Sequence, residues 1–171
     1  MQNKTRDMIL CAIFSAVICV CSIIAIPVWA IPITLGTFGV MVASSVLGVK
    51  RGTLSVVVFV LLGAIGIPVF SGFRGGLSVL TGVTGGYITG YLFMPLLSGR
   101  AKNCGIIKGC IYNMLAVVIC YVFGTAQYIY LTGTNIIAAL MMCVVPFIGF
   151  DIIKAIVATL FAIQIRKKCK L

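Results

Sequence analysis

The sequence consists mainly of long apolar runs whose ends are marked by lysine and arginine. A membrane-spanning helix needs about 20 predominantly apolar residues, and the chain has room for six such helices and little else. We therefore predict an all-α integral membrane protein in which residues 1–171 form a single bundle. The expected helices cover residues 8–28, 33–49, 53–69, 83–97, 109–131 and 147–165.

The composition excludes several classes of protein. Of the 171 residues, 62% are hydrophobic and only 9% are charged, whereas a soluble domain has about 25% charged residues. A soluble globular protein and a disordered chain are therefore excluded. The net charge of +11 could suggest a nucleic-acid partner. The basic residues, however, lie at the ends of apolar runs rather than on one face, which is typical of membrane proteins.

The distribution of basic residues predicts the orientation in the membrane. Cytoplasmic loops of membrane proteins carry an excess of lysine and arginine. With six helices and both termini in the cytoplasm, all but two of the 13 basic residues, Arg74 and Lys154, lie on the inner side. The opposite orientation would place almost all of them outside. We therefore expect both termini to be cytoplasmic.

Little in the composition can support catalysis. The chain has no histidine, only two acidic residues, Asp7 and Asp151, and no GK[ST] phosphate-binding motif. No two of its eight cysteines form a CxxC pair, so they are interpreted as small hydrophobic residues rather than metal or redox groups. We expect no enzymatic activity, no metal and no cofactor, and an autonomous pump is disfavoured. The energy for any transport would come from another chain.

Three charged residues do not fit the basic pattern. Arg74 lies in a glycine-rich stretch, 71–82, which is expected to be an irregular outer loop between the third and fourth helices. Asp151 and Lys154 are spaced to share one face near the outer end of the last helix. A charge inside a membrane span costs about 2.5–3.5 kcal/mol on insertion scales. Mutual neutralisation of Asp151 and Lys154 is one explanation, and a polar ligand pocket is the favoured one.

The chemistry of these charges suggests the kind of ligand. Together they leave one net positive charge, which suits a monoanion, and Asp151 could accept hydrogen bonds from paired N–H donors. Further candidate contacts at the same level are Ser71, Thr34, Tyr87, Gln127 and Tyr128. Asn113 is expected instead to bond a neighbouring helix, and the repeated glycines Gly82, Gly86 and Gly90 to permit close helix packing.

Three segments resemble the BioY family, the biotin-specific substrate-binding subunits of energy-coupling-factor (ECF) transporters. They read IPITLGTFGVMVASSVLG, GAIGIPVFSGFRGGLSVLTGVTGGYITG and VPFIGFDIIKAIVA, and the resemblance extends over nearly the whole chain. It implies six membrane helices in the plasma membrane of a bacterial cell and capture of biotin from outside. It further implies a partner module of one transmembrane coupling subunit and two ATPases. It also implies that Asp151 and Lys154 correspond to the charged motif of the last helix. Ser71 and the region 72–86 correspond to the outer loop.

The resemblance extends to the first helix and has three departures. Ala12 and Ala16 resemble the small-residue motif with which such subunits contact the coupling subunit; ordinary packing against the chain's own helices is the alternative. Gly36 stands where the family usually has Gln, Val83 where it usually has Pro, and Phe150 where it often has Gly.

A self-contained carrier or channel for another small anion remains the alternative function.

Overall fold

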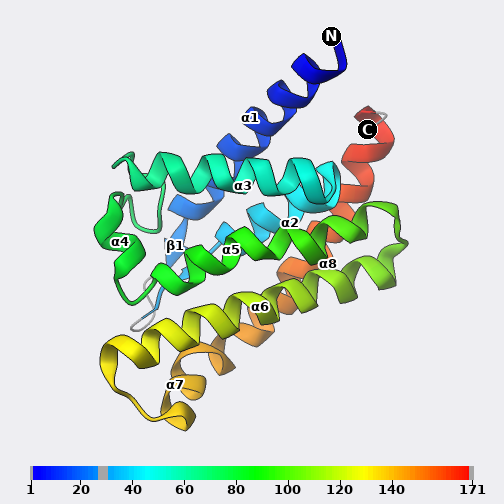
Figure 1. The fold of residues 1–171 in the computed structure, drawn as a ribbon. Coiled ribbons are helices and arrows are strands. Elements are labelled where there is room, and N and C mark those ends of the chain that lie inside the picture. The colour runs from blue at the N-terminus through cyan, green and yellow to red at the C-terminus, as the bar shows by residue number, and fades with distance from the viewer. Residues whose placement is uncertain (1, 27–30, 170–171) are drawn as a thin grey trace.

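The fold is almost entirely helical (Figure 1). The structure is a computed structural model that describes residues 2–26 and 31–169. Its long helices are α1 (Gln2–Ile23), α2 (Gly36–Leu47), α3 (Val49–Ala64), α5 (Gly85–Ser98), α6 (Ile106–Thr132) and α8 (Val145–Cys169). The short helices are α4 (Leu77–Thr81), α7 (Ile136–Cys143) and the 3₁₀ helix η1 (Gly99–Asn103).

Three segments among the described residues are long and apolar enough to cross a membrane. They are Lys4–Ile23, Ile106–Thr132 and Ile136–Cys169, which correspond to α1, α6 and the α7–α8 pair. Helix α2 is apolar but only 12 residues long. It is also the most enclosed helix, since eleven of its residues are buried, and it contacts α1, α3, α5 and α8. The core of the bundle is therefore built around α2.

The first helix begins and ends earlier than the sequence predicts, and the second helix is shorter. Helix α1 ends at Ile23, and a strand β1 (Ala25–Ile26) pairs antiparallel with β2 (Ile33–Thr34). The expected continuation of the first helix beyond Ile23 is wrong, because residues 25 and 26 form a strand; residues 27 and 28 lie outside the described part of the chain. The expected start of the second helix at residue 33 is wrong, because residues 33 and 34 pair as a strand and the Leu35 N–H donates to the Ile24 carbonyl at 3.1 Å.

The glycine-rich stretch is only partly irregular. It begins with a tight turn in which Phe70 and Arg74 pair through both backbone groups. A short helix, α4, then occupies residues 77–81, where the sequence predicts no helix. The residues Leu77–Thr81 contain no glycine, so the local glycine content does not prevent one helical turn from forming. The third helix also ends at Ala64, short of the predicted end at residue 69.

Glycines allow α5 and α6 to approach each other closely. A Cβ atom on Gly86 would lie 2.3 Å from the Phe123 carbonyl oxygen, and one on Gly90 would lie 2.9 Å from the Cα of Cys120. Both positions therefore require glycine, as the packing interpretation predicts. Gly82 does not belong to this contact, because it precedes α5 and follows α4.

The segments that carry most of the basic residues lie at one end of the bundle. Figure 1 shows both ends of the chain, the α2–α3 junction and the α5–α6 connection lying toward the same side. Asp7 on α1 forms an ion pair with Arg51 on α3 at 2.9 Å there. The β-hairpin, α4 and α7 lie toward the opposite side. Deeper in the bundle, Asn113 donates to Thr159 at 3.0 Å and accepts from Ser45 at 3.2 Å, so it bonds neighbouring helices as predicted.

Candidate functional site

A cavity of about 500 Å³ lies near the end of the bundle that carries the β-hairpin and α4. Volumes of about 300–1,000 Å³ are typical of small-molecule sites. Its walls come from segments far apart in the sequence: β2, the 70–74 turn, α5, α6 and α8. Six of the predicted site residues line it: Thr34, Ser71, Arg74, Tyr87, Asp151 and Lys154.

Asp151 and Lys154 form the polar centre of the cavity. They lie one turn apart on α8, and Lys154 Nζ is 2.9 Å from Asp151 Oδ1. Asp151 is 3% exposed and Lys154 9%. Removing a single member of such a buried pair leaves an uncompensated charge, which is strongly unfavourable. The pair thus holds an anion and a cation in an otherwise largely apolar bundle.

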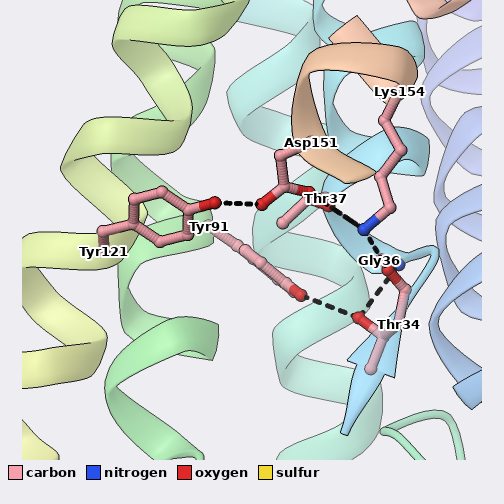
Figure 2. A network of polar contacts seen from close by, with 7 residues as sticks. All are labelled: Thr34, Gly36, Thr37, Tyr91, Tyr121, Asp151 and Lys154. Atoms are coloured by element: carbon pink, nitrogen blue, oxygen red, sulfur yellow. Dashed lines mark hydrogen bonds and ion pairs between the residues drawn. The ribbon is translucent and has the colours of Figure 1, made fainter. Parts of the chain in front are cut away.

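Two uncharged residues complete the surroundings of Asp151 (Figure 2). The Tyr121 hydroxyl on α6 donates to Oδ2, and the Thr37 hydroxyl on α2 donates to Oδ1 at 3.4 Å. An ionised carboxylate offers about four lone-pair sites, and Lys154, Thr37 and Tyr121 use three of them. One acceptor position therefore remains for an N–H donor of a ligand.

Lys154 also fixes the strand that borders the cavity. Its ammonium group donates to the Thr34 carbonyl at 2.8 Å and to the Thr37 hydroxyl at 3.4 Å. The Thr34 hydroxyl in turn lies 3.4 Å from the Tyr91 hydroxyl and accepts from the Gly36 N–H at 3.3 Å. Figure 2 shows these groups as one continuous network from α5 and α6 to α8.

At Gly36 the ring of a neighbouring tyrosine occupies the space of a side chain. A Cβ atom at residue 36 would lie 2.8 Å from the Tyr91 hydroxyl oxygen. The Tyr91 ring therefore fills the space that a side chain at position 36 would need. Tyr91 is buried and lines the cavity, so a polar group is present at this wall although residue 36 has no side chain.

The other predicted contacts differ in their roles. Ser71 and the exposed Arg74 lie on the turn at the cavity wall. Tyr87 lines the cavity and donates its hydroxyl to the Cys143 carbonyl at 2.9 Å, which connects α5 to the end of α7. Among the described residues no cluster of three or more histidine, cysteine or acidic side chains could hold a metal ion.

Two predicted polar contacts lie outside the cavity. The Gln127 amide donates to the Leu80 and Gly82 carbonyls at 2.9 and 2.8 Å, so it stabilises the segment that joins α4 to α5. Tyr128 packs with the small cluster around Phe147 and donates to the Met142 sulfur at 3.8 Å. The Gln127 amide is occupied by backbone carbonyls of α4 and of the residue that follows it, which the sequence does not reveal.

The sequence did not identify three polar residues of the site, Thr37, Tyr91 and Tyr121. All three are uncharged, and such residues are common in membrane helices for packing alone. Thr37 lies three residues after Thr34, but Thr34 belongs to β2 and Thr37 to α2, so helical spacing does not relate them. No sequence pattern marks Tyr91 or Tyr121 either.

The surface of α1 that carries Ala12 and Ala16 lies away from this cavity. Both alanines are exposed, and they are flanked by the exposed residues Ile13 and Val17. The alternative, packing of these alanines against the chain's own helices, is therefore contradicted. A strip of small side chains permits close approach of another helix.

Comparison with known proteins decides the family. The model of the BioY family matches residues 1–171. This chain belongs to the BioY family. Relatives of this BioY chain include the biotin transporter BioY of Thermotoga maritima, 36% identical with 95% of this chain and 96% of the relative covered. Another is the biotin transporter BioY2 of Lactococcus lactis, 34% identical with 96% and 93% covered.

A solved structure agrees with the fold of this BioY chain over nearly its whole length. It is the crystal structure of the S-component for biotin from an ECF-type ABC transporter. The TM-score is 0.90 at 29% identity, with 97% of this chain and 93% of the other covered. The family consists of transporter components rather than enzymes.

Proposed function

We propose that this BioY-family chain is the substrate-binding S-component for biotin of an ECF-type ABC transporter. The observation that carries the proposal is the buried Asp151–Lys154 pair in the wall of a ligand-sized cavity, in a chain whose relatives are named biotin transporters. A cavity lined mainly by apolar side chains with few polar groups suits a small, partly apolar ligand.

The chemistry of biotin matches the polar centre. Its ureido ring offers N–H donors beside a carbonyl acceptor, and its valeryl chain ends in a carboxylate. The remaining acceptor position of Asp151 suits a ureido N–H, and a hydrogen bond to a carboxylate is stronger than one between neutral groups. Thr34, Ser71 and Tyr87 are available for further contacts. Gln127 supports the site indirectly, through the backbone between α4 and α5.

The membrane arrangement follows from the basic end of the bundle. We propose six membrane crossings by α1, α2, α3, α5, α6 and α8, with both termini in the cytoplasm of a bacterial cell. The clustering of the basic chain ends and connections on one side supports this orientation, because cytoplasmic loops are rich in lysine and arginine. The cavity then opens toward the outside, where biotin is captured.

Transport requires partners in this proposal. The chain has no phosphate-binding motif, so ATP would be used by two ATPase subunits that act through a transmembrane coupling subunit. The exposed Ala12–Ala16 strip on α1 is the proposed contact with that coupling subunit. The chain itself needs no metal or cofactor for binding.

The function is tested by measuring binding and transport separately. Radiolabelled biotin should bind the purified full chain in detergent with one saturable site. Proteoliposomes that contain the chain with the coupling subunit and both ATPases should accumulate biotin only when ATP is present inside. Biotin accumulation by the chain alone would instead support a self-contained carrier. No biotin binding by the folded chain would contradict the proposed substrate.

A further inference from the structure

We propose that Arg51, Lys102 and Arg166 bind the phosphate group of an anionic phospholipid at the basic end of the bundle. The cavity described above lies toward the opposite end. This second site is therefore independent of the ligand proposed for the cavity. It depends only on the proposed membrane orientation, in which the basic end faces the cytoplasm.

Three separate elements bring these cations together. Arg51 lies in the first turn of α3, Lys102 in η1 and Arg166 in the last turn of α8. The short helix η1 contacts both α3 and α8. All three side chains are half-buried, whereas the other basic side chains that the structure describes at this end are exposed. Their burial distinguishes them from cations that merely flank a membrane helix.

The cluster carries more positive charge than the acidic side chains of the sequence can neutralise. The sequence has only two acidic residues, Asp7 and Asp151. Asp7 pairs with Arg51 at 2.9 Å, and Asp151 pairs with Lys154 in the cavity. Three cations and one carboxylate therefore leave two positive charges without an acidic side chain to oppose them.

This excess charge is unfavourable for Lys102. Burial lowers the pKa of Lys102, and the neighbouring Arg51 and Arg166 lower it further, while Asp7 acts in the opposite direction. Lys102 lies in the connection between α5 and α6 rather than in a membrane-spanning helix. A bound anion would offset both effects, because it replaces lost hydration and opposes the repulsion between like charges.

The cluster also has hydrogen-bond donors to spare. Lys102 Nζ donates to the Leu47 carbonyl at the end of α2, at the long distance of 3.5 Å. A cation stabilises the C-terminus of a helix, but that role needs one cation and not three. Arg166 Nε donates to the Ala162 carbonyl at 3.2 Å, and its other N–H groups have no partner among the residues that the structure describes. A guanidinium group can bind a phosphate through two parallel hydrogen bonds.

The position of the cluster favours a lipid headgroup as the source of the phosphate. In the proposed orientation the cluster lies where helices end at the cytoplasmic face, and basic pockets between helices on that side bind anionic headgroups. Leu54 follows Arg51 by three residues on α3, so the two share a face. Leu54 is 48% exposed and offers apolar surface to an acyl chain whose headgroup binds Arg51.

The experiment measures lipid binding to the full chain in detergent by native mass spectrometry. The probes are dioleoylphosphatidylglycerol, which is anionic, and dioleoylphosphatidylcholine, which has the same acyl chains and no net charge. The wild type should bind its first phosphatidylglycerol molecule about tenfold more tightly than phosphatidylcholine. The double variant Lys102→Gln/Arg166→Gln should lose this preference. The control Lys167→Gln/Lys168→Gln removes the same charge from exposed positions at the same end and should keep it. Both double variants should bind biotin like the wild type.

The other outcomes overturn the site in distinguishable ways. Equal binding of both lipids by the wild type would show that no anion site exists. Equal loss of the preference in the two double variants would show that net charge, and not the cluster, attracts the lipid. Displacement of phosphatidylglycerol by an equal concentration of inorganic phosphate would assign the cluster to a soluble anion.

A single variant keeps the test decisive if Lys102→Gln/Arg166→Gln does not fold. Arg166→Gln leaves the bond from Lys102 to α2 intact and should lose part of the preference for phosphatidylglycerol. An unchanged preference in Arg166→Gln would overturn the site. Absence of biotin binding by the folded wild type would contradict the proposed function and leave the lipid result unaffected.

Discussion

The hydroxyl group of Tyr121 on α6 donates a hydrogen bond to Oδ2 of Asp151 on α8. This bond joins two helices across the wall of the cavity. With Lys154 and Thr37 bonded to the other oxygen, it restricts which lone pair of the carboxylate is free. We propose that Tyr121 positions Asp151 for the ligand.

Substitution Tyr121→Phe should weaken biotin binding while the protein stays folded. The change removes one hydrogen bond to a charged group, worth about 1.5–3 kcal/mol. Because the ring and its packing remain, we expect a loss of roughly tenfold in affinity. Isothermal titration of the purified variant measures it. Tyr112→Phe, a change on the same helix outside the cavity lining, is the matched control, and equal affinities for the two variants would contradict the positioning role.

The proposed orientation predicts the accessibility of two cysteines. Cys104 follows η1, and Cys169 ends α8 with an exposed side chain, so both belong to the basic end of the bundle. A membrane-impermeant thiol reagent applied to intact cells should label neither, and permeabilisation should make Cys169 reactive. Mass spectrometry of the labelled peptides measures this. Labelling of Cys169 in intact cells would reverse the orientation.

Bulky residues on the exposed strip of α1 should separate binding from assembly. Ala12→Trp or Ala16→Trp should block co-purification with the coupling subunit but leave biotin affinity unchanged, since both positions are exposed and lie outside the cavity lining. Leu115→Trp on α6, which is also an exposed position, serves as the control that keeps assembly. If complexes form normally with Trp at both alanine positions, the coupling subunit contacts another surface.

The charged residues that line the cavity are those that the sequence marks, and the reason is energetic. Because charges are costly inside a membrane helix, Asp151 and Lys154 are conspicuous in an apolar run. In the structure both residues line the cavity, together with Arg74. Tyr91 and Tyr121 carry no such cost, and their positions depend on how α5 and α6 pack. The same holds for Gln127, whose amide bonds the Leu80 and Gly82 carbonyls instead of lining the cavity.

The helix positions are predictable from the sequence, but the helix boundaries are only partly so. Apolar length locates the helices, because bilayer thickness and helix rise are fixed. It does not show where an apolar run changes from helix to strand. Residues 25–26 and 33–34 lie in largely apolar surroundings, yet they pair as a hairpin. The hairpin matters for the site, since its second strand presents the Thr34 carbonyl to Lys154.

The central claim of the proposed function is that Asp151 is the acceptor for the ligand. Equilibrium titration of biotin against the wild type and Asp151→Asn measures this. Loss of a hydrogen bond to a charged group costs about 1.5–3 kcal/mol, so Asp151→Asn should raise the dissociation constant by roughly 10- to 150-fold. An unchanged dissociation constant in a folded Asp151→Asn protein would contradict the account and place the biotin site elsewhere in the chain.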